Sequence, residues 1–146
     1  MTPTARESKW LLDVNVLLAL AWPWHEHHEV CREWITQHPG ITICTCPITQ
    51  MGFVRLSLLP RPERAANSTE AMRYLAVITR LEYHEFWPDS LSWAEADALQ
   101  GRLTGHLQVT DAYLVALARA HFARLLTLDR GMRQLQGADG VVELLA

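Results

Sequence analysis

Short apolar runs alternate along this chain with longer segments of helical periodicity, and this alternation limits the fold more than any other feature. The runs that predict strands are Trp10–Leu12, Ile41–Cys46, Tyr83–Trp87, Leu125–Leu128 and Val141–Leu144. The segments that predict helices are Val14–Trp22, His25–Gln37, Pro47–Leu58, the stretch that follows Asn67, the stretch from Ser92 to Gly101, and Asp111–Ala120. Strands separated by helices form βαβ units, which build a parallel sheet. We therefore expect an α/β fold with a central parallel sheet.

Helix starts carry recognisable signals in several places. Asn67 and Glu70 have the spacing of a capping box, and Ser92 and Glu95 repeat it. Thr110 is expected to cap the helix that begins at Asp111. With 146 residues and 49% hydrophobic composition, these elements fit one compact domain over residues 1–146.

Charge and cysteine content exclude several classes of protein. The formal net charge is −3, which argues against a generic basic coat for nucleic acid, although 12 of the 13 basic residues are arginines that can grip phosphate. Cys31, Cys44 and Cys46 form an odd set without a paired C-x-x-C motif, so a disulfide framework and a four-ligand zinc site are not indicated. No apolar run reaches the roughly 18 residues needed to span a bilayer. We expect a cytoplasmic protein without membrane attachment.

Three aspartates stand where apolar segments give way to polar turns or helix starts. Asp13 and Asp129 follow predicted strands, and Asp111 opens a predicted helix. Each alone is equally an ordinary helix cap. Ligands of an open α/β sheet bind outside the carboxyl ends of its strands, so the three side chains are expected at one edge. Carboxylates gathered there favour a hard divalent cation such as Mg²⁺.

Four segments together resemble the PIN domain ribonucleases, and in particular the VapC toxins of bacterial toxin–antitoxin pairs. The segments are LLDVNVLLAL (11–20), CPITQMGFVRL (46–56), GHLQVTDAYL (105–114) and LTLDRG (126–131). The resemblance implies a PIN-like three-layer α/β/α domain with its core at about residues 10–145. It also implies that Asp13, Asp111 and Asp129 are the catalytic acids of an endoribonuclease and hold Mg²⁺ or Mn²⁺. The implied partners are an RNA substrate, a cognate VapB-like antitoxin and a second copy of the chain in a homodimer.

One position departs from the family pattern. PIN nucleases usually carry a glutamate early in the helix after the second strand, and Gln50 stands at the matching place. An amide adds no negative charge, so we expect one tightly held ion, with a second recruited alongside the substrate phosphate. Asn15 and Thr127, each two residues from an acid, are candidate supporting residues, as is His106 in the loop before Asp111.

Two other functions are considered. A catalytically weak PIN-like module that binds RNA or a protein partner is compatible with Gln50 at the position of the usual acid. A Rossmann-like nucleotide binder is disfavoured, because no glycine-rich phosphate loop follows the first strand.

Overall fold

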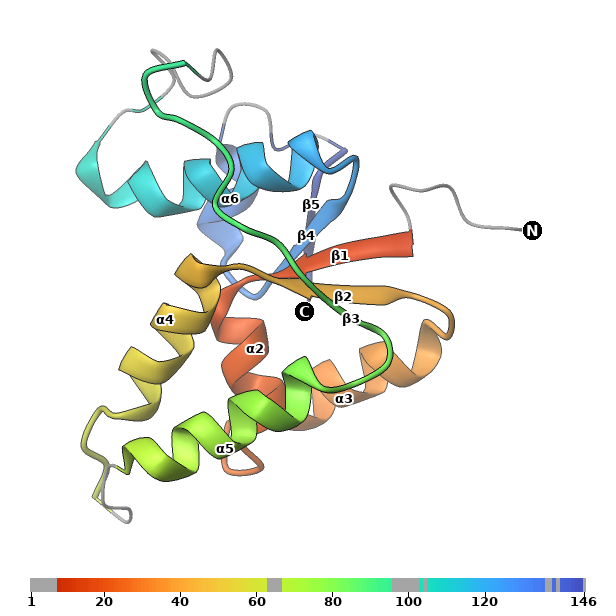
Figure 1. The fold of residues 1–146 in the computed structure, drawn as a ribbon, viewed down its shortest axis with the longest axis vertical. Coiled ribbons are helices and arrows are strands. Elements are labelled where there is room, and N and C mark those ends of the chain that lie inside the picture. The colour runs from red at the N-terminus through yellow and green to blue at the C-terminus, as the bar shows by residue number, and fades with distance from the viewer. Residues whose placement is uncertain are drawn as a thin grey trace.

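A computed structural model describes residues 8–62, 67–95, 103, 105–135, 138 and 140–145. Its centre is a sheet of five parallel strands in the order β3-β2-β1-β4-β5 (Figure 1). The strands are β1 (Lys9–Leu12), β2 (Thr42–Thr45), β3 (His84–Phe86), β4 (Arg124–Thr127) and β5 (Val142–Leu144). The parallel sheet expected from the alternating sequence pattern is confirmed.

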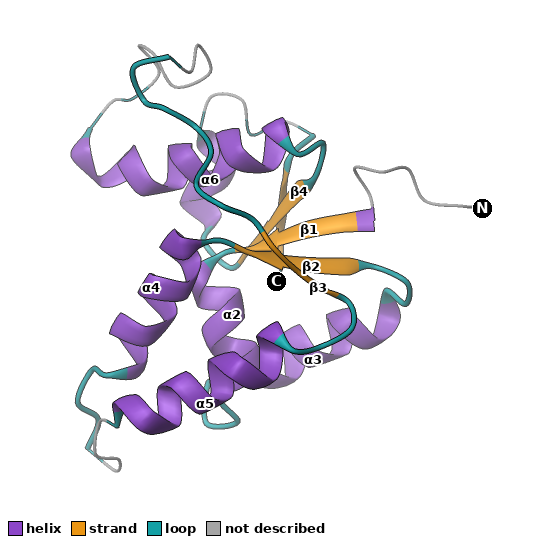
Figure 2. Ribbon diagram, viewed as in Figure 1, coloured by secondary structure: helices purple, strands orange, loops and turns teal. Residues whose placement is uncertain are grey.

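Helices cover both faces of the sheet, as Figures 1 and 2 show. One face is covered by α2 (Val14–Ala21), α3 (His28–Gln37), α4 (Pro47–Ser57) and α5 (Ser68–Thr79), and the other by α6 (Val109–Ala120). Two short 3-10 helices, η2 (His106–Gln108) and η3 (Arg130–Gln134), complete the described elements. The expected three-layer α/β/α arrangement is confirmed. None of the described helices is long and apolar enough to cross a membrane.

The sheet divides the hydrophobic core in two, because side chains alternate along each strand. On β1, Trp10 and Leu12 join the cluster beneath α2 to α5, whereas Leu11 joins the cluster beneath α6. The same alternation on β4 assigns Leu126 to the first cluster and Leu125 to the second. Helix α6 is buried continuously over residues 113–118, as its apolar sequence predicts. Beyond their first residues, β1 and β4 are therefore buried on both faces, and polar chemistry is restricted to the strand ends.

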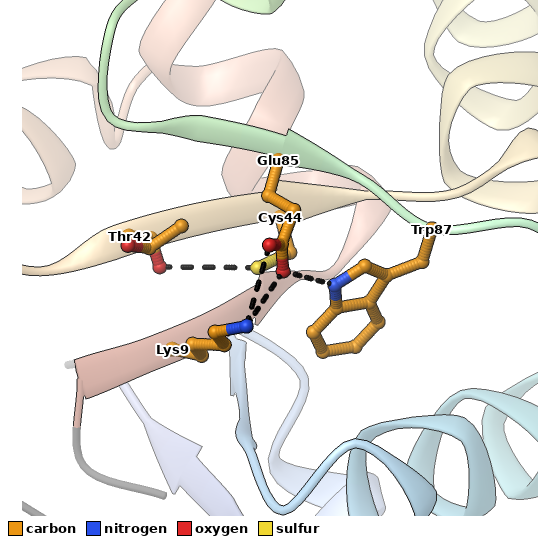
Figure 3. Close-up of polar contacts among 5 residues, drawn as sticks. All are labelled: Lys9, Thr42, Cys44, Glu85 and Trp87. Atoms are coloured by element: carbon orange, nitrogen blue, oxygen red, sulfur yellow. Dashed lines mark hydrogen bonds and ion pairs between the residues drawn. The ribbon is translucent and has the colours of Figure 1, made fainter. Parts of the chain in front are cut away.

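Polar contacts on the α6 side tie the edge strand β3 to β1 across β2 (Figure 3). Lys9 Nζ lies 3.1 Å from Glu85 Oε2, and Trp87 Nε1 donates to the same oxygen at 2.7 Å. Cys44 is fully buried below this group, and burial, with a smaller contribution from the Glu85 charge, raises the pKa of its thiol to about 12. A thiol that stays protonated is neither a nucleophile nor a metal ligand. Cys44 therefore serves as a core residue.

Two helix starts differ from the sequence prediction. Helix α3 starts at His28 rather than His25, because hydrogen bonds from His25 N to the Trp22 carbonyl and from His28 N to the His25 carbonyl form turns first. The proposed capping role of Thr110 is wrong. The η2 turn leads directly into Val109 with Gln108 already in helical conformation, so Thr110 lies inside the first turn of α6. The helix predicted from Ser92 to Gly101 falls largely on residues 96–102, outside the described residues.

Helices α2 and α4 approach each other closely at Gly52. A Cβ atom at Gly52 would lie 2.6 Å from Val14 Cγ2, and a valine in a helix is confined to one main rotamer. Overpacking lowers the stability of the folded protein by about 1–3 kcal/mol, and the higher helix propensity of alanine offsets about 1 kcal/mol of this loss. We therefore expect Gly52→Ala to lower the free energy of unfolding by about 1 kcal/mol, as measured by urea denaturation.

Gly105→Ala provides the matched control for this substitution. A Cβ atom at Gly105 meets nothing within 4 Å, so the free energy of unfolding should change by less than about 0.5 kcal/mol. A Gly52→Ala protein as stable as the wild type would contradict the close approach of α2 and α4.

Candidate functional site

The carboxyl ends of β1 and β4 meet at the centre of the sheet. Leu12 of β1 pairs with Leu126 of β4, and the backbone N–H of Asp13 donates to the Leu126 carbonyl at 2.9 Å. The strand order changes direction here, since the chain builds outward from β1 through β2 to β3 and then returns to place β4 on the other side. Such a switch point opens a crevice in α/β sheets. The first aspartate and the end of β4 therefore share one edge.

Asp13 is held rigidly at this edge. Its side chain caps α2, because Oδ1 accepts from the backbone N–H of Val14 at 2.8 Å, while Oδ2 accepts from the Thr127 hydroxyl at 2.7 Å. The residue is 6% exposed. Burial raises the pKa of the Asp13 carboxyl, the two hydrogen bonds partly oppose the rise, and the Asp129 charge adds to it. The protein thus keeps an acid where ionisation is unfavourable without a nearby positive charge.

Thr127 joins Asp13 to Asp129. Its hydroxyl donates to Asp13 and accepts from the backbone N–H of Asp129 at 2.9 Å. Asp129 is fixed in turn, since its Oδ1 accepts from the Gly131 backbone N–H at 2.8 Å and caps η3. Thr127 is fully buried, and its hydrogen bond to Asp13 is shielded from water, whereas the bond from the Asp129 N–H is partly buried. The side chain predicted to support the acids lies between two of them.

Asp111 comes from the opposite layer of the molecule. It lies in the first turn of α6 and is partly buried. Burial, followed by the charges of Asp13 and Asp129, raises the pKa of the Asp111 carboxyl to about 6. The charges of Asp13 and Asp129 act on Asp111, so the start of α6 faces the same edge of the sheet as the other two acids.

The three acids suit a hard divalent cation. They offer oxygen donors alone, and mutual repulsion together with burial makes a positive charge favourable among them. Among the described residues, no group of three or more His, Cys, Asp or Glu side chains is placed so that it could hold a metal ion as it stands. The carboxylate oxygens are nevertheless the type of donor that Mg²⁺ or Mn²⁺ prefers.

Comparison with known proteins identifies the family. The PIN domain profile matches residues 10–138. This chain belongs to the PIN domain family. It is 41% identical to Ribonuclease VapC38 of Mycobacterium tuberculosis (strain ATCC 25618 / H37Rv) over 138 residues, covering 92% of this chain and 96% of that protein. It is 44% identical to Ribonuclease VapC44 of the same strain over 123 residues, covering 84% and 87%. The chain is thus a VapC-type PIN protein.

A solved structure shares the fold of this VapC-type chain. The crystal structure of VapBC2 from Rickettsia felis, bound to a DNA fragment from their promoter, superposes with a TM-score of 0.62 at 13% sequence identity. The match covers 94% of this chain and 99% of that one. At this low identity the likeness supports the PIN fold alone.

Gln50 of this PIN domain belongs to a separate polar network. Its Nε2 donates to Thr45 Oγ1 at 2.9 Å, and Thr45 Oγ1 lies 2.7 Å from His84 Nε2. Burial lowers the pKa of His84, so the neutral ring can accept from the Thr45 hydroxyl while Thr45 accepts from Gln50. This network shares no residue with the one that joins Asp13 to Asp129. Gln50 therefore acts as a hydrogen-bond donor on the β3 side of α4.

The other predicted supporting residues are more exposed. Asn15 lies exposed on the first turn of α2, and His106 begins η2 with its side chain exposed. Their proposed roles in supporting the acids stay predictions. Sequence reasoning missed Thr45 and His84 as partners of Gln50. The available signal was that Thr45 is a polar residue on the same face of its strand as the buried Ile43.

Replacing Thr127 tests the bridge between the acids. Thr127→Val keeps the shape of the side chain but leaves the Asp13 carboxylate and the Asp129 N–H without this partner. We expect the free energy of unfolding to fall by about 2–4 kcal/mol, because buried polar groups lose their hydrogen bonds. Chemical denaturation measures the effect. Thr127→Ser retains the hydroxyl and should lose about 1 kcal/mol for the missing methyl group. Equal stability of the two variants would argue against the bridge.

The raised pKa of Asp111 predicts a pH-dependent stability. A carboxyl with a folded-state pKa of about 6 and a usual value of 3.8 contributes stability at low pH, and this contribution is lost as pH rises between these values. Asp111→Asn removes that loss. In metal-free protein its Tm should exceed that of the wild type by roughly 3 °C above pH ~6, allowing for solvent screening, with little difference near pH ~4.

The effect of a divalent cation on the Tm of the same two proteins is the second test. Mn²⁺ should raise the Tm of the wild type more than that of Asp111→Asn, because the variant has lost a ligand. Asp89→Asn, at an exposed position, is the charge-matched control and should show neither effect. A Tm difference for Asp111→Asn that stays constant from low to neutral pH would refute the electrostatic coupling.

Proposed function

We propose that this chain is a metal-dependent endoribonuclease that hydrolyses RNA phosphodiester bonds, and that it is the toxin of a VapBC-type toxin–antitoxin pair. The observation that carries the proposal is the group of Asp13, Asp111 and Asp129 at the sheet edge, two of them joined through Thr127. The relatives that are named VapC ribonucleases at about 40% identity support the same activity.

Each residue of the site has a separate role in the proposed hydrolysis. Asp13, Asp111 and Asp129 would hold Mg²⁺ or Mn²⁺, which when bound supplies charge stabilisation at the scissile phosphate and acidifies the attacking water. Thr127 fixes the Asp13 carboxylate relative to the backbone of Asp129, and the Gly131 N–H holds the Asp129 carboxylate, so little reorganisation is needed when substrate enters. Asp111, with a pKa of about 6, becomes charged toward neutral pH and completes the acid group there. The products would carry a 5′-phosphate and a 3′-hydroxyl.

A protein partner and a homodimer belong to the same proposal. The relatives at about 40% identity are named VapC ribonucleases, and we extend the antitoxin of VapBC-type pairs to this chain on that similarity. A VapB-like antitoxin would inhibit the nuclease until it is removed. We place this activity in the cytoplasm, where the RNA substrate is found.

A second candidate function is a PIN module that binds RNA without cutting it. The observation in its favour is Gln50, which supplies an amide where the family usually has a carboxylate and which hydrogen-bonds to Thr45. The two candidates make different predictions for the same purified protein.

An RNA cleavage assay distinguishes them. Protein freed of any copurified antitoxin is incubated with total RNA and Mg²⁺ or Mn²⁺, with and without chelator. We expect discrete cleavage that chelator abolishes and that Asp13→Asn reduces on the order of 100-fold or more, because the most rigidly held acid is lost.

The assay needs a control for folding and charge. Asp89→Asn removes the same charge at an exposed position and should cleave like the wild type. Thermal melting of Asp13→Asn shows whether the variant keeps its fold. RNA binding by the wild type without any metal-dependent cleavage would instead establish the binding module.

A further inference from the structure

We propose that Arg130 and Arg133 form a subsite that binds a backbone phosphate of single-stranded RNA next to the scissile bond. The proposal deepens the proposed nuclease function and rests on it for the identity of the polymer. Its observations are independent of metal binding. They concern the geometry of η3, the pocket beside it and the exposure of its two arginines.

The geometry of η3 places both guanidinium groups together. A 3-10 helix has three residues per turn, so side chains at positions i and i+3 project from the same side. Arg130 and Arg133 have this spacing. Met132 between them is fully buried in the α6-side core, which anchors η3 and turns the arginines outward. Both line an open pocket of about 480 Å³.

The pocket has a fixed relation to the acid group. Asp129 immediately precedes η3, and its carboxylate caps that helix through the Gly131 N–H at 2.8 Å. The same Asp129 is connected to Asp13 through Thr127. A strand of RNA with one phosphate at the acids therefore passes η3 with a neighbouring phosphate.

Charge gives the pocket its preference for an anion. Both arginines are exposed, and none of the ion pairs between described residues involves them. Arg124 differs, since its Nη2 donates to Glu143 at 2.9 Å. A guanidinium fork matches two phosphate oxygens, and positive charge beside the acids offsets their repulsion of a polyanion.

The remaining lining residues favour a nucleotide over a free anion. Gln134 adds an amide that both donates and accepts, which suits a ribose 2′-hydroxyl or a base edge. Leu144 at the end of β5 adds an apolar wall. Phosphate, amide and apolar contacts together describe one nucleotide of an RNA strand.

RNA binding without turnover tests the subsite separately from catalysis. Wild type and the double variant Arg130→Gln/Arg133→Gln are titrated with a short single-stranded RNA in EDTA, at several salt concentrations. We expect the double variant to bind about tenfold more weakly, and its slope of log affinity against log salt to fall by roughly 0.7, since each phosphate contacted on a single strand contributes about 0.7.

Two further variants sharpen the result. Arg73→Gln/Arg80→Gln removes the same charge from exposed positions on and directly after α5, on the other face of the sheet (Figure 1), and should bind like the wild type. Arg133→Lys keeps the charge but loses the fork, so it should retain the salt slope while losing part of the affinity. Equal weakening in the η3 and α5 double variants would overturn the subsite, because general charge would then explain binding.

The source of the phosphate is also tested. Calorimetry with inorganic phosphate should show no binding tighter than millimolar in the wild type. If phosphate bound tightly to the wild type alone and RNA affinity were unchanged in the η3 variant, the pocket would be a free-anion site and the proposal would be wrong. A wild type that fails to cleave RNA, but whose RNA binding depends on the η3 arginines, would refute the nuclease function and leave the subsite standing.

Discussion

The hydrogen bonds of one buried hydroxyl hold the candidate site together. Thr127 donates to Asp13 Oδ2 and accepts from the Asp129 N–H, so acids that are 116 positions apart in the chain share a single rigid connection. Because the hydroxyl is fully buried, water cannot replace it. Asp13 caps α2 and Asp129 caps η3, so the same connection also fixes where a helix starts on each side of it.

The sheet order explains why this connection forms at the switch between β1 and β4. Strands β2 and β3 lie on one side of β1 and strands β4 and β5 on the other, which leaves the carboxyl ends of β1 and β4 side by side. Helix α2 leaves from one face, and α6 packs on the opposite face with Asp111 in its first turn. The acids therefore approach from both layers of helices. Their charges and burial raise the pKa of Asp13 and Asp111, and a divalent cation would relieve that cost.

Electrostatic roles around the site are divided among separate elements. Gln50 contributes no charge and serves a hydrogen-bond chain through Thr45 to His84, on the side of the edge strand β3. Positive charge is supplied by η3, where the spacing of Arg130 and Arg133 places both on one side of a single turn. Acidic residues that favour a cation and arginines that favour a phosphate thus lie directly next to each other along the chain, at Asp129 and Arg130.

Local pattern was sufficient to predict the parallel α/β sheet and most element boundaries, because apolar periodicity is a property of short segments. Local pattern also nominated Asp13, Asp111 and Asp129 as the site, and that assignment stays a prediction. It placed the start of the last long helix wrongly at Asp111, since the η2 turn before Val109 has no strong local signal. Sequence reasoning placed Gln50 at the position of the family's usual glutamate as a supporting residue, and the structure adds that its amide donates to Thr45. Which polar groups meet depends on strand order and helix packing over long separations. The sequence by itself determined which polar side chains stand at each strand end. The tertiary structure decided that Thr127 joins Asp13 to Asp129 and that Gln50 donates to Thr45. The physical reason is that a buried hydrogen bond forms only between groups that packing brings into contact.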